Sequence, residues 1–279
     1  MSIQLLKNKV VIVTGGSGGI GNAIVNRLSN CEANVVSVFH HNLPANISDE
    51  NVFCFQSDLT RSEEWERLLN YTLEKFRKVD VLVNCAGILE PGEFCSIDIN
   101  QLRKMVELNL TSVLIGILKT SVIMKDQGYG HIINIGSLGG IVPMPYSSVY
   151  SATKFALRGF SLSLFEELKG TNVKVSLITP GSVITKMLDY EAQAENSAIS
   201  FLSKPISPAK VAEVVLKVID KPKVELIIPR SQSISSKLLV SSPRIFSIAY
   251  KLLHRLGLSG KRKYLNRYCN FSFMKGVAR

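Results

Sequence analysis

The sequence predicts a doubly wound α/β domain, in which a parallel sheet of about seven strands is covered by helices on both faces. Short apolar, β-branched runs alternate along the chain with longer segments of helical periodicity. This alternation is typical of βαβ units, whose strands pair in parallel. With 279 residues, of which 46% are hydrophobic, the chain can form one good-sized core or at most two small ones. Disordered and fibrous proteins are therefore excluded.

Seven apolar runs are the candidate strands. They span residues 10–13, 34–38, 52–56, 81–84, 131–135, 174–179 and 226–228. Helical patterns begin near Gly19, Ser62, Asn100, Tyr150 and Ser207. The last of these starts is strengthened by Pro208, which suits the first position of a helix capped by serine.

The charge is unevenly distributed along the chain. Residues 1–229 hold equal numbers of basic and acidic residues, whereas residues 230–279 hold 11 of the 33 Lys and Arg and no Asp or Glu. We therefore expect a neutral globular domain over 1–229 and a basic C-terminal extension over 230–279.

The cysteines and the N-terminus indicate a cytoplasmic protein. Five cysteines are scattered without the spacing of a metal site, so we expect no metal and a reducing compartment. The first residues lack the pattern of a secretion signal. We expect no helix that spans a bilayer.

The first candidate strand leads through a glycine-rich loop into a helix. Gly15, Gly19 and Gly21 fit the spacing TGxxxGxG, whereas Gly15, Gly18 and Gly21 fit TGxxGxxG. Glycines let the backbone turn tightly and approach a pyrophosphate, whose charge then lies at the helix N-terminus. The alternative is a plain turn, which the position between the first strand and the first helix makes less favoured.

Two tyrosines stand four residues before a lysine, a spacing that places both side chains on one face of a helix. They are Tyr150 with Lys154 and Tyr71 with Lys75. Ser137 precedes Tyr150 by thirteen residues and follows a predicted strand, at the edge of the sheet where ligands bind in such folds. The Tyr150 pair is therefore the candidate site, and the Tyr71 pair is interpreted as a solvated helix face.

These elements together resemble the short-chain dehydrogenase/reductase family, in its single-domain branch. Asn84-Cys85-Ala86-Gly87 is similar to the family's NNAG element, although Cys85 replaces the second Asn. The segment 180–185, beginning with Pro180-Gly181, resembles its PGxxxT element, and Asp58-Leu59 resembles the pair that meets adenine. The resemblance covers about residues 6–229 and implies a Rossmann-type fold with a bound nicotinamide cofactor.

The resemblance implies a role for each catalytic candidate. Tyr150 would be the general acid in carbonyl reduction and the general base in alcohol oxidation. Ser137 would hold the substrate oxygen, and Asn109 would support a water-mediated proton path. Lys154 would lower the pKa of Tyr150 and bind the nicotinamide ribose. The cofactor-binding residues would be Gly15, Ser17, Gly19, Ile20, Gly21, Phe39, His40, Asp58, Leu59, Asn84, Ala86, Gly87, Tyr150, Lys154, Pro180, Gly181, Val183 and Thr185.

The end of the second predicted strand bears on the choice of cofactor. A carboxylate there commonly binds the ribose hydroxyls of NAD, and this chain has Phe39, followed by His40 and His41. An arginine that would bind the 2′-phosphate of NADP is absent as well. We expect NADP as the preferred cofactor and NAD as the alternative, with the histidines as candidate phosphate contacts.

The predicted function is NAD(P)-dependent interconversion of a hydroxyl and a carbonyl by hydride transfer. The substrate would be a small apolar molecule, whether lipid-, steroid-, retinoid- or acyl-like, because the expected pocket is apolar. Its lining would be Val142, Pro143, Met144, Tyr146, Met187, Leu188, Tyr190, Ile199, Phe201 and Leu202. The alternatives are a non-catalytic nucleotide-binding regulatory or scaffold protein and an epimerase or dehydratase of the same fold. The resemblance also implies a homodimer or homotetramer formed through two long helices.

The basic extension contains a predicted amphipathic helix, with Ser242 as N-cap, Pro243 at its first position and Gly257 at its C-terminal end. Arg244, Lys251 and Arg255 form a basic line, and apolar residues of 243–256 occupy the opposite arc. Such a helix is suited to peripheral association with an anionic membrane, and packing of its apolar face on protein is the alternative. The cluster beginning at Lys261 has no recognition fold beside it, so no nucleic-acid partner is expected.

Overall fold

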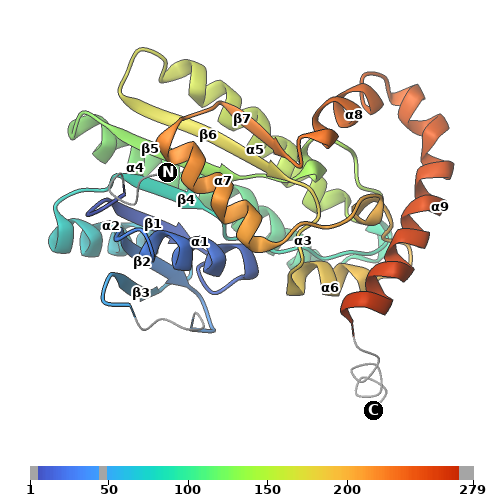
Figure 1. Ribbon diagram of the computed structural model, residues 1–279, viewed down its shortest axis with the longest axis horizontal. Coiled ribbons are helices and arrows are strands. Elements are labelled where there is room, and N and C mark those ends of the chain that lie inside the picture. The colour runs from blue at the N-terminus through green and yellow to red at the C-terminus, as the bar shows by residue number, and fades with distance from the viewer. Residues whose placement is uncertain (1–5, 44–48, 270–279) are drawn as a thin grey trace.

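A computed structural model describes residues 6–43 and 49–269 of the chain, so residues 270–279 of the basic extension lie outside the described part. Its centre is a seven-stranded parallel sheet in the order β3-β2-β1-β4-β5-β6-β7 (Figure 1). The doubly wound α/β prediction is confirmed. The strands are β1 (Val10–Thr14), β2 (Asn34–Phe39), β3 (Val52–Gln56), β4 (Val81–Asn84), β5 (Gly130–Ile135), β6 (Val173–Pro180) and β7 (Glu225–Ile228).

Helices follow most strands and return the chain across the sheet. They are α1 (Gly19–Ser29), α2 (Ser62–Phe76), α3 (Ile99–Val106), α4 (Ser112–Asp126), α5 (Ser148–Glu167), α6 (Lys186–Gln193), α7 (Pro208–Asp220), α8 (Ser231–Leu239) and α9 (Pro243–Tyr268). The sequence predicts the starts of α1, α2, α3, α5 and α7 to within two residues. It does not predict α6 or α8.

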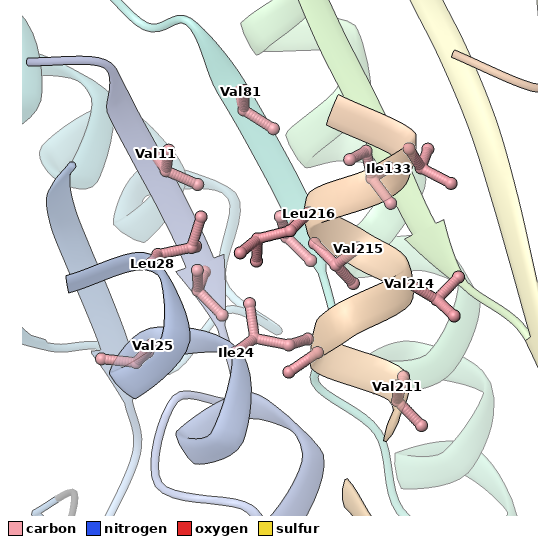
Figure 2. Close-up of a cluster of buried hydrophobic side chains, with 14 of the residues drawn as sticks. Val11, Ile24, Val25, Leu28, Val81, Ile133, Val211, Val214, Val215 and Leu216 are labelled. Atoms are coloured by element: carbon pink, nitrogen blue, oxygen red, sulfur yellow. The ribbon is translucent and has the colours of Figure 1, made fainter. Parts of the chain in front are cut away.

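One face of the sheet is covered by α1 and α7, which lie side by side (Figure 2). Ile24 and Leu28 of α1 and Val215 of α7 are completely buried against Val11 of β1 and Ile133 of β5. The strands carry apolar side chains on both faces of the sheet, because helices cover the other face as well.

The opposite face is covered by α2, α4 and α5. Trp65 of α2 is buried beneath α4, where a Cβ on Gly116 would overlap the indole ring. Ile117 of α4 and Leu157 of α5 belong to the same buried cluster. The sheet is therefore the middle of three layers, as the sequence predicts.

The segment Ile99–Asp126, which runs through α3 and α4, is by length and composition alone apolar enough to cross a membrane. It contains charged residues, and it packs against α2, α5 and β5. Of its most apolar window, 33% is buried within the protein.

The C-terminal extension wraps the edge of the sheet at which the strands end (Figure 1). There α9 packs on α6 and on the short 3₁₀ turn η5 (Ile199–Phe201). The prediction that this helix ends at Gly257 is wrong, because α9 continues to Tyr268. Gly257 is a contact point: a Cβ there would overlap the backbone of Ala198, and one on Gly260 would overlap that of Phe201.

Candidate active site

The loop between β1 and α1 is shaped by its glycines. Gly15 has a φ of 67°, in the left-handed region that favours glycine. A Cβ on Gly19 would lie 2.7 Å from Cγ2 of Thr185, and one on Gly21 would overlap the carbonyl of Gly15. At Gly18 the nearest atom would be 3.2 Å away, so that position is less restricted. Gly15 and Gly21 are common to both spacings, and the closer contact at Gly19 than at Gly18 favours TGxxxGxG.

The first turn of α1 is suited to an anion. Gly18 is its N-cap, no side chain caps the helix, and the first turn contains no acidic residue. The first N–H groups of a helix have no partner within the helix, and the helix dipole is positive at this end. Ser17 and Ile20 lie half-buried in and beside the loop. These residues fit the pyrophosphate of a dinucleotide.

Thr14 joins β1 to the loop that follows β4. Its buried Oγ1 accepts hydrogen bonds from the backbone N–H of Cys85 at 2.9 Å and of Ala86 at 3.1 Å. Asn84 is buried, and its side-chain amide donates to Asn134 at 2.9 Å. Both bonds to Thr14 come from the backbone, so Cys85 in place of asparagine leaves this attachment of the loop intact.

Tyr150 and Lys154 lie one turn apart on α5 and are 8% and 7% exposed. Nζ of Lys154 is 5.8 Å from the centre of the Tyr150 ring and donates to the carbonyl of Ile135 at 3.1 Å. Ser137 caps the 3₁₀ turn η4 (Leu138–Gly140) and forms a hydrogen bond with Tyr150. The fold thus brings a hydroxyl, a phenol and an amine together.

Asn109, the fourth catalytic candidate, lies in a π-helical turn, η3 (Glu107–Thr111), between α3 and α4. Such turns occur often at functional sites. Its Oδ1 accepts from the N–H of Ile88 and its Nδ2 donates to the carbonyl of Ile88, both at 2.8 Å. A Cβ on Gly87 would lie 3.2 Å from Oδ1 of Asn109 and 3.9 Å from Nζ of Lys154. The Asn109 side chain therefore holds the loop after β4 close to Lys154.

Burial dominates the titration of the phenol and the amine. It raises the pKa of Tyr150 to about 12, while the hydrogen bond with Ser137 lowers this pKa and the charge of Glu191 raises it further. Burial also lowers the pKa of Lys154 to about 8. The sequence predicts a lowered pKa for Tyr150, but in the chain alone desolvation of the tyrosinate outweighs the nearby amine. At neutral pH Tyr150 is a phenol that can donate a proton.

The segment after β6 forms a further wall. Pro180 is the last residue of β6, and the N–H of Gly181 donates to β7 at 2.7 Å. Val183 forms a short parallel bridge, and Thr185 is the N-cap of α6 and lies against Gly19. The N-terminus of α6 is thereby held against the glycine-rich loop between β1 and α1.

These walls enclose a pocket of about 370 Å³, within the range of small-molecule sites. Ser137, Tyr150, Val183 and Thr185 all line it. The expected apolar side chains that line it are Val142, Met144, Met187, Leu188, Ile199 and Leu202.

Four residues expected to line the pocket do not. Pro143 and Tyr146 are absent from its lining. Phe201 packs on the ring of Tyr264 in α9, and the hydroxyl of Tyr190 donates to Glu90 at 2.5 Å. An aromatic residue in a covering segment can face the protein that anchors the segment, which its sequence position does not reveal.

The comparison with known proteins agrees with this geometry. Residues 9–196 match the model of the family described as short chain dehydrogenase. The chain belongs to the short-chain dehydrogenase family. It is 29% identical over 243 residues to an uncharacterized oxidoreductase of Staphylococcus saprophyticus. The matched residues cover 82% of this chain and 99% of the relative. It is 30% identical over 226 residues to an uncharacterized oxidoreductase of Staphylococcus aureus strain USA300, or 79% of this chain and 95% of the relative.

In this short-chain dehydrogenase the polar groups at the end of β2 come from two histidines. Phe39 is buried, whereas His40 and His41 are exposed, with ring centres 3.7 Å apart. Nε2 of His40 is 3.9 Å from Oδ2 of Asp58. Leu59 is buried in the core beside them. A nucleotide at this edge would therefore meet His40 and Asp58.

The dehydrogenase also has pocket residues that sequence reasoning misses. Glu191 of α6, Gln232 and Leu239 of α8 and Leu253 of α9 line the pocket. The last three lie beyond the part that matches the family model. Leu253 follows a helical apolar pattern, but the pattern alone does not show that its helix returns to the active site. Glu191 has no distinctive neighbours in the sequence.

The side chains of the second tyrosine–lysine pair, Tyr71 and Lys75, contact aromatic rings of β3. Tyr71 packs on Phe55, with ring centres 5.2 Å apart, and Nζ of Lys75 lies 4.4 Å from the centre of the Phe53 ring. Both aromatic partners belong to β3, at the sheet edge remote in strand order from β5. The interpretation of this pair as a solvated helix face is therefore wrong for Tyr71, which packs on the sheet, whereas Lys75 is exposed.

Proposed function

We propose that this oxidoreductase interconverts a hydroxyl and a carbonyl on a small apolar substrate, with NADP as the preferred cofactor and NAD as the alternative. The observation that carries the proposal is the meeting of Ser137 and Tyr150 at one wall of an otherwise mostly apolar pocket, with Lys154 one turn from Tyr150 on α5. An apolar pocket with a few convergent polar groups is typical of a site that orients a small molecule for reaction.

The side chains divide the reaction between them. When bound, the nicotinamide cofactor supplies or accepts the hydride. Ser137 holds the substrate oxygen, and Tyr150 gives that oxygen a proton in reduction or removes one in oxidation. Lys154 favours the tyrosinate in the oxidative direction by its charge and would contact the ribose. Gly15, Gly19 and the first turn of α1 would hold the pyrophosphate.

The preference for NADP rests on the residues at the end of β2. No carboxylate occupies the position of Phe39, so nothing there repels a 2′-phosphate. His40 and His41 are exposed and can donate hydrogen bonds to phosphate oxygens. Asp58 beside His40 is the residue that favours NAD as the alternative.

Two alternatives, a regulatory nucleotide-binding protein and an epimerase or dehydratase of the same fold, can be distinguished from this proposal. A regulatory nucleotide-binding protein needs no proton donor in the pocket, and an epimerase or dehydratase gives no net change in the nicotinamide. A screen of apolar ketones and alcohols that follows nicotinamide absorbance with both cofactors tests the proposal. Net turnover that is lost in Tyr150→Phe supports it. Cofactor binding without net turnover of any ketone or alcohol would overturn it.

We further propose that the enzyme forms a homodimer or homotetramer through α4 and α5. Leu118 and Val122 on α4 and Phe155 on α5 are large apolar side chains that are 65%, 53% and 40% exposed. Apolar surface of this kind favours association between copies. Sedimentation of Leu118→Asp should show a smaller species than the wild type, and Lys125→Asp is a matched surface control.

We also propose that the enzyme is cytoplasmic and associates peripherally with an anionic membrane. The prediction that the apolar residues of α9 all lie on the arc opposite the basic line is wrong. Phe246 and Leu253 pack toward the body, while Ile245, Ile248, Leu252 and Leu256 are exposed. Arg244, Lys251 and Arg255 are exposed on the same solvent side. Basic and apolar side chains together favour an anionic lipid surface over water.

A further inference from the structure

Glu191 is a carboxyl group in the wall of an apolar pocket. It is only 4% exposed, yet it is among the residues that line the pocket beside Tyr150. Burial of a carboxylate is costly unless its oxygens are hydrogen-bonded or paired with a cation. The partners of its two oxygens therefore indicate what the group does.

The two carboxyl oxygens of Glu191 are used unequally. The hydroxyls of Ser197 and Ser200 both donate to Oε1, each at 2.7 Å. Across the residues that the structure describes, no group donates to Oε2. Glu191 is itself a lining residue of the pocket, so its unpartnered oxygen belongs to the pocket wall. One acceptor thus remains open to a ligand.

A purely structural role would account for Oε1 alone. Ser197 and Ser200 lie in the segment after α6, so their bonds to Oε1 fix that segment. Lys261 of α9 is the nearby cation, but its ammonium donates to the backbone carbonyls of Ala194 and Glu195. In the described parts of the chain, no cation lies within ion-pair distance of Glu191. Anchoring of the segment therefore leaves Oε2 unexplained.

The charge of Glu191 also reaches the reacting end of the pocket. It raises the pKa of Tyr150, so the two groups are close enough to interact. Burial raises the pKa of Glu191 itself, while its two serine hydrogen bonds and the charge of Lys261 lower it. A ligand donor on Oε2 would supply the partner that burial demands.

We propose that Glu191 determines substrate specificity: its Oε2 accepts a hydrogen bond from a second polar group of the substrate, a hydroxyl or an amine, separate from the reacting carbonyl. This inference rests on the proposed carbonyl chemistry at Tyr150 and names the substrate class more closely. A wholly apolar ketone leaves a desolvated acceptor unpaired, and sites of this kind reject such analogues strongly. The favoured substrate is therefore apolar over most of its surface with one donor group.

The test compares matched ketones in the full-length enzyme. The parent is the bicyclic ketone 2-decalone, and its partners carry one added hydroxyl or one added primary amine. The ratio of kcat/KM for the substituted and parent ketones is measured, together with the thermal shift that each ketone gives in the presence of cofactor. We expect the wild type to favour at least one substituted ketone tenfold or more. The substituent that is favoured distinguishes the hydroxyl from the amine.

Glu191→Gln should remove this preference. The two serines can still donate to the amide oxygen, which turns the amide N–H₂, a donor, toward the position of Oε2. Glu195→Gln is the matched control, since its side chain is exposed on the same segment and should leave the ratio unchanged. If the Gln variant does not fold, Glu191→Asp replaces it, because the shorter side chain withdraws the acceptor and should also reduce the ratio.

The outcomes separate this inference from the proposed function. Equal ratios in wild type and Glu191→Gln, in both turnover and thermal shift, overturn the role of Glu191 even if the enzyme reduces every ketone. Absence of any preference in the wild type does the same. A different result would refute the proposed function. In that case the thermal shift given by the ketones would depend on Glu191, but no turnover that depends on Tyr150 would be found.

Discussion

The hydroxyl of Tyr264 in α9 donates to the carboxylate of Asp189 in α6 at 2.6 Å. This bond joins the C-terminal helix to the helix that covers the pocket. Lys261 adds bonds to the two carbonyls that follow α6, and Gly257 lets α9 approach Ala198 closely. The basic extension therefore holds in place α6 and the segment after it, which line the pocket.

Tyr264→Phe should loosen α6 without removing any pocket residue. A hydrogen bond to a charged group contributes roughly 1.5–3 kcal/mol, part of which supports the ordered covering segment. We expect KM for the substrate to rise several-fold while the affinity for the cofactor changes little, measured by steady-state kinetics and by cofactor titration. Tyr268→Phe is the control, because that ring packs on Tyr264 and its hydroxyl lacks a described partner. An unchanged KM in Tyr264→Phe would show that α6 is held by the other contacts.

The sheet and the helices on its faces could be predicted because each leaves a local pattern. The buried strands are continuous apolar runs, and α2 and α7 have a regular apolar stripe. The same reasoning fails for the C-terminal extension. A glycine in a helical pattern is a common stop signal, but Gly257 allows close packing on a segment 59 residues earlier, which no local pattern encodes.

Some residues of the candidate site could be predicted from the sequence, and others could not. Tyr150, Lys154 and the glycine loop are short motifs with fixed spacing, so the sequence places them on one helix and one turn. The role of Glu191 depends on which side chains surround it after folding. Likewise, the raised pKa of Tyr150 follows from burial, a property of the whole fold rather than of the motif.

Tyr150→Phe should reduce kcat by several orders of magnitude, because it removes the proton that the substrate oxygen receives. The phenyl ring keeps the packing, so the cofactor should bind almost as in the wild type. Tyr71→Phe is the matched control and should leave kcat within about twofold. The measurement is steady-state turnover in both directions together with cofactor titration. Near-normal turnover in Tyr150→Phe would refute the assignment of the proton donor.

The pH dependence of the two directions should differ. Oxidation needs tyrosinate, whose fraction rises tenfold per pH unit below the pKa, and burial raises that pKa to about 12. The kcat/KM for alcohol oxidation should therefore keep rising across the alkaline range. Lys154 favours the tyrosinate only while it is charged, so this rise should become less steep above about pH 8. Reduction uses the phenol, which stays protonated below its raised pKa, so its kcat/KM should stay level over the same range. Oxidation that reaches a plateau below neutral pH would contradict a Tyr150 pKa raised by burial.

His40→Asp should shift cofactor preference from NADP toward NAD. Its side chain is exposed at the end of β2, so the new carboxylate can repel a 2′-phosphate and accept ribose hydroxyls. Phe39→Asp is a poorer choice, because Phe39 is buried and a carboxylate there would be desolvated. We expect the ratio of the two dissociation constants, measured by titration with NADP and NAD, to change at least tenfold. A wild type that already prefers NAD tenfold would overturn the preference proposed for NADP.

Membrane association is best tested by charge reversal, since truncation at residue 230 would remove Leu253 and Leu239 from the pocket wall. The variant changes Arg244, Lys251 and Arg255 to Glu. Each basic residue near an anionic surface contributes about 1 kcal/mol, so this reversal should lower co-sedimentation with anionic liposomes tenfold or more at low salt. Binding of the wild type should also weaken at physiological ionic strength, where the Debye length is about 8 Å.

Two controls separate the lipid surface from other occupants of α9. Reversal of Lys104, Lys125 and Lys223 to Glu makes the same change in net charge on exposed residues outside α9, and it should leave liposome binding largely intact. Ile248→Ser with Leu252→Ser removes exposed apolar area and should weaken binding even at low salt, because insertion adds to the electrostatic attraction. If the α9 variants bind liposomes as the wild type does, but sediment as a smaller species, then a second copy of the chain covers this face and the membrane proposal fails.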